Sequence, residues 1–143
     1  MKKILTVLLF CILTVGMASV ASAEEWRYIG GEDGYTWFFD TQSFQKVNDT
    51  TYSVQLKLEY NEATGRKAAK EFKLKAPLAY VVDKSEFNFH DKKIRALAVT
   101  YYDKKGNVLN FHNTPTQWAS VFPNDMGGTM LKATYTYYKQ HYK

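Results

Sequence analysis

The stretch FNFHDKKIRALAVTYYDKKGNVLNFH, from Phe87 to His112, decides the fold that the sequence predicts. Two short polar runs, residues 91–93 and 103–107, divide it into three segments that have the character of consecutive β-strands. The middle segment, residues 94–102, is rich in the β-branched and aromatic residues that suit a pleated sheet. Glycine and asparagine in the second run supply the positive backbone φ of tight hairpins. The stretch therefore predicts an antiparallel meander.

The middle strand of this meander is unusual because it carries only one charge, on Arg95, and that charge lies near its start. Strict alternation places Ile94, Ala96, Ala98, Thr100 and Tyr102 on one face and Leu97, Val99 and Tyr101 on the other. We expect such a strand to be central in the sheet, with both faces covered for part of its length. The two alanines leave room for a covering helix.

A second long strand is predicted between Thr51 and Tyr60, where apolar and polar residues alternate without interruption. The apolar face comprises Tyr52, Val54, Leu56, Leu58 and Tyr60. We expect this face to be buried and the opposite face to contact water. Two further strands, residues 26–29 and 35–39, flank a glycine-rich turn and predict an N-terminal hairpin, and residues 44–47 are a candidate short strand.

The C-terminal segment is the best candidate for a covering helix. Met126, Met130, Ala133, Tyr137 and His141 recur at spacings of four, three, four and four. Asn124 or Asp125 can cap this helix at its start. Gly127-Gly128 and the alternation over residues 134–137 oppose a helix, and the periodic stripe outweighs them. Residues 61–75 fit either a short amphipathic helix or a solvated connection.

The first 23 residues have the three parts of a secretory signal peptide. A basic start and the apolar run 4–15 precede the small residues Ala21, Ser22 and Ala23, where we expect cleavage. The run is too short to span a hydrocarbon core of roughly 30 Å as a helix. We therefore expect an exported protein with one domain, residues 24–143, and no transmembrane segment after cleavage.

Charge and cysteine content exclude several classes of protein. Removal of Lys2 and Lys3 lowers the formal net charge from +5 to +3, and the remaining basic residues are dispersed, so we expect no nucleic-acid partner. The single cysteine, Cys11, lies inside the predicted signal peptide and lacks the small preceding residue of a lipidation site. We therefore expect a mature chain with neither a disulfide nor a lipid anchor.

No motif in the sequence predicts catalysis or a cofactor. His90, His112 and His141 form no closely spaced pair, and zinc requires three or four converging ligands. A metal or haem site assembled from distant segments remains a third hypothesis. Asp40 and Ser43 resemble part of a nucleophilic site, but an Asx-type turn explains them better. We therefore expect a protein that is not an enzyme.

Two pairs of lysines are candidate partner-binding residues. Lys92 and Lys93 lie in the first turn of the meander, and Lys104 and Lys105 lie in the second. Together they would form a basic rim for an acidic partner surface. Turn lysines also keep a sheet soluble and its edges unattractive to other strands, and this is the more economical interpretation.

The order of these motifs resembles the bacterial surface-adhesin protein E family. The matching segments are Trp26 with its Gly/Asp turn, the strand ending at Asp40, the alternating strand from Tyr52, Phe87-Asn88-Phe89 with residues 93–97, Tyr102-Asp103 with residues 106–108, and Trp118 with residues 121–123. The resemblance implies an α+β fold, with one antiparallel sheet of about six strands and a C-terminal helix across one face.

The resemblance also implies an adhesin-like module that binds host extracellular-matrix proteins, and it allows a homodimer. The alternative is a soluble periplasmic accessory domain that binds a small ligand or an envelope partner. Export is common to both, so the protein would reside in the periplasm, on the cell surface or outside the cell.

This chain departs from the family pattern at His90. Family members commonly carry a cysteine there, bonded to a cysteine in the terminal helix, and this chain has neither. Such a bond typically contributes about 2–4 kcal/mol. We therefore expect the helix to be held by the packing of Met130, Tyr137 and their neighbours alone.

Overall fold

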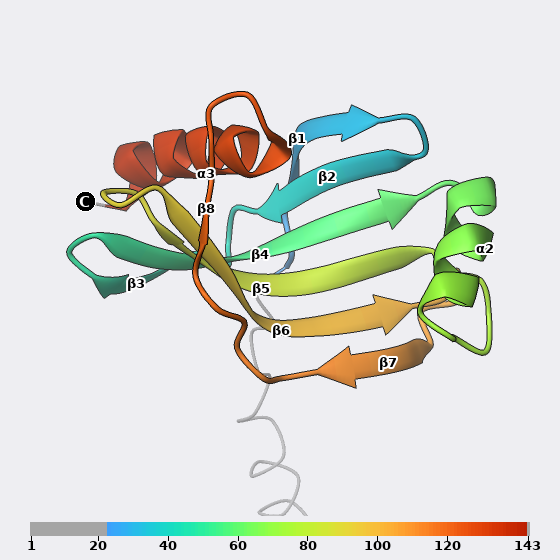
Figure 1. Ribbon diagram of the computed structural model, residues 1–143. Coiled ribbons are helices and arrows are strands. Elements are labelled where there is room, and N and C mark those ends of the chain that lie inside the picture. Colours follow the sequence, from blue (N-terminus) through green and yellow to red (C-terminus); the bar gives the residue numbers. More distant parts are fainter. Residues whose placement is uncertain (1–22, 143) are drawn as a thin grey trace, which may run out of the picture.

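The computed structural model describes residues 23–142 and confirms an α+β fold (Figure 1). The strands are β1 (Trp26–Glu32), β2 (Tyr35–Asp40), β3 (Gln45–Asn48), β4 (Thr51–Tyr60), β5 (Tyr80–Asn88), β6 (Lys93–Tyr102), β7 (Val108–His112) and β8 (Ala119–Ser120). Two helices, α2 (Glu62–Glu71) and α3 (Met126–His141), complete the described residues. Ala21 and Ser22 of the expected cleavage site lie outside the described residues, and Ala23 is exposed.

One curled antiparallel sheet contains all the strands, as predicted. Six strands follow the order β1-β2-β4-β5-β6-β7, while β3 pairs with the start of β4 and β8 pairs with the start of β6. The predicted meander is β5, β6 and β7. The predicted bounds of its first strand, residues 87–90, are wrong, because β5 begins at Tyr80 and ends at Asn88, and Phe89 and His90 belong to the turn. The N-terminal hairpin is also confirmed, although β1 continues through Gly30 and Gly31 and only Asp33 and Gly34 form the turn.

Strand β4 occupies the bounds that its alternation predicts. Tyr52, Val54 and Leu56 are almost completely buried on the face that packs against α3, which we name the covered face. Direct antiparallel partners point to the same side, so the covered face continues through Phe87 and Val81 of β5. The opposite face of β4 is not solvated throughout, because Ser53 is also buried.

The predicted faces of β6 are wrong beyond Ala96 because the strand contains a bulge. Lys84 pairs with Ala98 while Ser85 pairs with Ala96, so Leu97 has no partner on β5. One extra residue reverses the alternation, and Val99 consequently lies on the covered face with Ile94. Among the described residues, helices cover only that face, whereas on the opposite face Trp118 lies over Arg95 near the start of β6.

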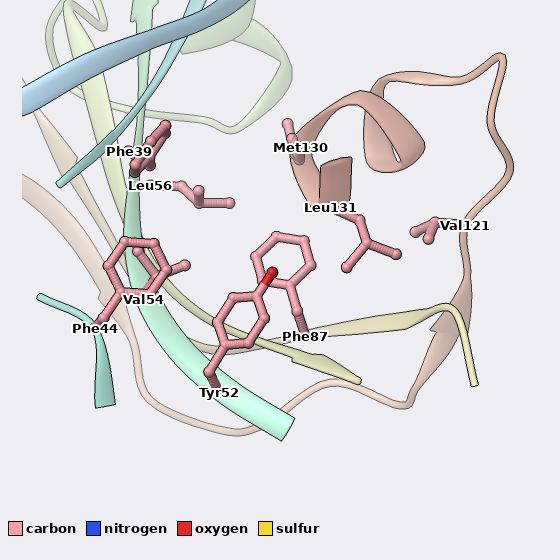
Figure 2. Packing of buried hydrophobic residues seen from close by; sticks show 9 residues of the cluster. All are labelled: Phe39, Phe44, Tyr52, Val54, Leu56, Phe87, Val121, Met130 and Leu131. Carbon is pink, nitrogen blue, oxygen red and sulfur yellow. The ribbon is translucent and has the colours of Figure 1, made fainter. Parts of the chain in front are cut away.

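Helix α3 packs across the end of the covered face where β4 begins and β5 ends (Figures 1 and 2). Its buried residues are Met130, Leu131 and Thr134, and Tyr135, Tyr137 and Tyr138 pack against the same cluster. The predicted stripe is correct in outline, but its last member, His141, is exposed. The ring of Tyr138 stacks on Tyr52 at a centroid distance of 4.6 Å.

Gly127 and Gly128 are required at the start of α3 rather than merely tolerated. A Cβ atom at Gly128 would lie 1.8 Å from the carbonyl oxygen of Phe122, and one at Gly127 would lie 2.7 Å from the side chain of Val121. The carboxylate of Asp125 accepts a hydrogen bond from the Gly128 N–H and caps the helix. Close packing therefore requires glycine at these two positions, although glycine has a low intrinsic helix propensity.

Residues 62–71 form a helix, so of the two alternatives for this region, a short amphipathic helix or a solvated connection, the helix is correct. Asn61 caps α2 by accepting a hydrogen bond from the Thr64 N–H. Ala68 packs with Leu78 and Val81 in a second apolar cluster at the other end of the covered face. A Cβ atom at Gly65 would lie 2.0 Å from the Leu78 carbonyl oxygen, so α2 approaches the following loop closely.

A buried hydroxyl pair allows a test of how α3 is held. The Tyr52 hydroxyl and Thr134 Oγ1 lie 2.7 Å apart, and Thr134 Oγ1 also donates to the Met130 carbonyl oxygen. We predict that Thr134→Val lowers the free energy of unfolding by about 1–3 kcal/mol, because the Tyr52 hydroxyl is then buried without a partner. Tyr52→Phe leaves Thr134 satisfied and should cost less. Urea unfolding of both variants measures the difference, and a larger loss for Tyr52→Phe contradicts it.

Asp83 is an acid on the covered face, in the cross-strand row Leu56–Asp83–Val99 where the two apolar clusters meet. Burial raises the pKa of Asp83 to about 6, although a hydrogen bond from Ser85 partly opposes this shift. The folded protein therefore binds this proton more tightly than the unfolded chain does. The carboxylate destabilises the fold above pH 6, and this cost disappears as the pH falls toward 4.

We predict that Asp83→Asn stabilises the protein at pH 7.5 by up to about 3 kcal/mol, and that this gain vanishes near pH 4. Chemical unfolding of both proteins across this pH range measures it. Asp91→Asn is the control, because a hydrogen bond from His90 lowers the pKa of exposed Asp91 and its removal should destabilise at neutral pH. A gain for Asp83→Asn that is independent of pH contradicts the assignment.

Candidate binding surface

The face of the sheet opposite the two helices carries aromatic side chains without a covering element. Two cross-strand rows define this open face: Tyr28, Phe38, Lys57, Val82, Thr100 and Phe111, and next to it Gly31, Thr36, Glu59, Tyr80, Tyr102 and Val108. Each row extends across six strands, from β1 to β7. Tyr28 is 62% exposed and Phe111 is 53% exposed, at opposite edges of the first row. Exposed aromatic residues on an uncovered sheet face are typical of an interaction site.

The rings of the open face are held in fixed orientations by one another and by a lysine. Tyr28 packs edge-on against Phe38 at a centroid distance of 6.1 Å, and Tyr80 stacks on Tyr102 at 4.7 Å. The Lys57 ammonium lies 4.7 Å from the centre of the Trp26 ring, a cation–π contact. Rigid rings lose little conformational entropy on binding, which favours their use as anchors.

A shallow hollow of about 250 Å³ lies within the open face. Its lining comprises Glu24, Trp26, Lys57, Glu59, Tyr80, Val82 and Tyr102. The Lys57 ammonium and the Glu59 carboxylate lie 2.9 Å apart, and the Trp26 indole N–H donates to Glu24. The Lys57–Glu59 pair is internally balanced and Glu24 adds one negative charge, so the hollow presents aromatic rings with polar, weakly acidic edges.

Tyr80, one of the two stacked tyrosines of the hollow, remains protonated at physiological pH. Partial burial raises the pKa of Tyr80, and the neighbouring Tyr102, Glu24 and Asp103 raise it further. Its neutral hydroxyl can both donate and accept a hydrogen bond. The hollow can thus contact apolar groups with its rings and peptide groups with its hydroxyls, which is the usual combination at protein–protein interfaces.

A second anchor on the open face lies nearer the start of β6. Buried Glu86 accepts a hydrogen bond of 2.7 Å from Arg95, whose guanidinium lies 4.7 Å from the centre of the Trp118 ring. Trp118 is 37% exposed, on the segment that follows β7. Tryptophan and arginine are the residue types most often found at interaction hot spots.

The four predicted partner-binding lysines do not lie together. Lys92 and Lys93 lie at the turn between β5 and β6, and Lys104 and Lys105 lie at the turn between β6 and β7. These turns are at opposite ends of a ten-residue strand, roughly 30 Å apart. Lys92 lines a groove beside α3, whereas Lys104 and Lys105 line a groove of about 520 Å³ beside α2. A single basic rim is therefore not formed, and their role in binding stays a prediction.

The other candidates from the sequence have local structural roles. Asp40 Oδ1 accepts a hydrogen bond from the Gln42 N–H, two residues on, which confirms the Asx-type turn. The Ser43 hydroxyl donates to the Asp40 carbonyl oxygen and accepts from the Gln55 N–H. Within residues 23–142, no group of three or more His, Cys, Asp or Glu side chains is placed to hold a metal ion.

The residues of the open face were not singled out from the sequence as binding residues. Trp26 and Tyr28 are two residues apart in β1 and share a face, whereas neighbouring Phe38 and Phe39 of β2 point to opposite faces, so the sequence carries a signal for two aromatic faces. Phe39 is buried on the covered face, whereas Phe38 lies on the open face. Alternation shows that two faces exist, but only the position of the helices shows which face stays open.

The fold defines a small α+β protein in which the described helices cover one side of a single sheet. A model of the Surface-adhesin protein E family matches residues 26–134, and the chain belongs to that family. Searches of curated proteins and of solved structures found no match. The family is one of adhesin-like binding proteins and is generally non-enzymatic. In the part of the chain that the structure describes, no helix is long and apolar enough to cross a membrane.

Proposed function

We propose that this protein is an exported, non-enzymatic adhesin-like module that binds a host extracellular-matrix protein through its open face. The observation that carries the proposal is the pair of cross-strand rows in which aromatic residues from β1 to β7 remain uncovered. Membership of the surface-adhesin protein E family supports binding as the function. The signal-peptide pattern of residues 1–23 supports export, and β1 begins three residues after Ala23.

The shape of the open face favours a protein partner over a small molecule. Its hollow measures about 250 Å³, below the range of roughly 300–1,000 Å³ that is usual for small-molecule sites. Around the hollow lie several separate aromatic anchors, Tyr28, Phe111 and Trp118 among them, at distances that only a large partner can bridge. Protein interfaces combine such anchors with a polar rim.

The runner-up is a periplasmic accessory domain that binds a small ligand or an envelope partner. The groove of about 520 Å³ between α2 and the β6–β7 turn favours it, since this volume suits a small ligand. Cell fractionation with protease added to intact cells separates the two functions. Protein confined to the periplasm and shielded from the protease would rule out adhesion.

We predict that the mature chain, residues 24–143, binds at least one immobilised host matrix protein saturably at micromolar concentration. Tyr28→Ser combined with Phe111→Ser should weaken that binding about tenfold or more, because both exposed rings are removed from the interface. The control is Phe72→Ser, which removes a ring that is 45% exposed at the end of α2. Circular dichroism and urea unfolding check that all variants are folded.

Two outcomes would contradict this prediction. One is the absence of saturable binding to any of a panel of matrix proteins. The other is a dimer that Tyr28→Ser and Phe111→Ser dissociate while matrix binding is unchanged, which would assign the open face to self-association. Light scattering of the purified proteins distinguishes this case.

A further inference from the structure

A groove of about 600 Å³ runs along the outer side of α3, away from the open face. Its walls are the helix, the segment 121–123 and the turn that carries Lys92. The lining comprises Lys92, Val121, Phe122, Pro123, Gly128, Thr129, Leu131, Lys132, Tyr135, Thr136 and Lys139. Three of these residues are lysines and none is acidic, so the groove is electropositive.

The walls of this groove are fixed relative to one another. The Val121 N–H donates to the Lys92 carbonyl oxygen, which ties the segment before α3 to the β5–β6 turn. The Phe122 N–H donates to the Asp125 carboxylate, which also caps α3. Gly128 allows the helix to touch this segment. The groove is therefore preformed, and ligand binding does not require its walls to lose further conformational entropy.

The floor of the groove is apolar. Val121 and Leu131 are buried and contact the main core (Figure 2), whereas Phe122 is 60% exposed beside them. The Tyr135 ring contributes an aromatic surface and stacks on Phe89 at 4.5 Å. An exposed phenylalanine over a fixed apolar floor is an open docking position for an apolar side chain.

The lysines of the groove are free to meet a ligand. Within residues 23–142, no carboxylate lies within ion-pairing distance of Lys92, Lys132 or Lys139. The Lys139 ammonium lies 4.7 Å from the centre of the Tyr135 ring, so its charge is held over the groove. This contrasts with Lys57 of the open face, which is paired with Glu59.

The spacing of these lysines selects the form of the ligand. Lys132 and Lys139 are seven residues apart on one side of α3, which separates them by about 10.5 Å along the helix axis. In a polyproline II segment, every third side chain points to the same side, and such residues are about 9 Å apart. Carboxylates three positions apart in an extended segment therefore match the two lysines, while intervening apolar residues can reach the floor.

We propose that the α3 groove binds an extended acidic peptide segment of a protein partner, with Asp or Glu at every third position and proline or another apolar residue between. Charge complementarity to Lys92, Lys132 and Lys139 carries the proposal. Aromatic-lined grooves also favour the polyproline II conformation, because it is largely ordered before it binds. This binding site is independent of the open face.

Fluorescence polarisation with a labelled peptide, Glu-Pro-Leu-Glu-Pro-Leu-Glu-Pro, tests the proposal. The full mature chain should bind this peptide, and binding should weaken with rising salt because exposed charges are screened. Replacement of Lys92, Lys132 and Lys139 by Gln should weaken binding about tenfold or more. Lys104→Gln with Lys105→Gln is the matched control and should leave binding unchanged, as should Tyr28→Ser with Phe111→Ser.

Three results would overturn the proposal. A peptide of equal composition with its three glutamates adjacent could bind equally well, which would show that spacing is not recognised. The triple lysine variant could bind as tightly as the parent. Vesicles containing phosphatidylglycerol could compete with the peptide for the lysines, which would assign the groove to lipid headgroups. Because the open-face variant retains the groove, failure here is distinguishable from failure of matrix binding.

Discussion

Both helices pack on the same face of a single sheet, and the other properties of the molecule depend on this one-sided packing. Tyr52 lies at its centre, completely buried, with Phe87 on the neighbouring strand and Tyr138 of α3 stacked on its ring. The part of the chain that the structure describes contains no cysteine, so α3 is held without a covalent tether. Stacked rings and one hydroxyl pair fix its register, because a displaced helix would leave buried polar groups unsatisfied.

One-sided packing leaves the second face of the sheet in water, where threonine and charged residues would suffice for solubility. The open face instead combines Trp26, Phe38 and the Tyr80–Tyr102 stack with the cation of Lys57. Lys57 contacts two rings and pairs with Glu59, so its charge keeps the aromatic surface hydrated and is itself balanced by a carboxylate. This balance suits a reversible protein contact better than a permanent core.

Much of this fold could be predicted from the sequence, because β4 alternates strictly and α3 carries a helical stripe. The bulge at Leu97 could not, since an inserted residue changes the register without any distinctive residue type. Gly127-Gly128 was weighed against a helix because propensity ignores the close approach of Phe122. The open face could not be predicted from the sequence for a similar reason. Tryptophan and tyrosine suit a core and an interface equally, and only the helices decide between them.

The two surfaces differ in the kind of partner that their charges can recognise. On the open face Lys57 and Arg95 are each paired with a carboxylate, while exposed Lys84 has no ion-pair partner among the described residues, so recognition there depends mainly on ring shape and hydrogen bonds. In the α3 groove the lysines lack such partners among the described residues, so recognition depends on charge and its spacing. The segment between β7 and α3 joins them, with Trp118 on one surface and Phe122 on the other. Substitutions there would disturb both surfaces, whereas Phe111 and Lys139 report on each separately.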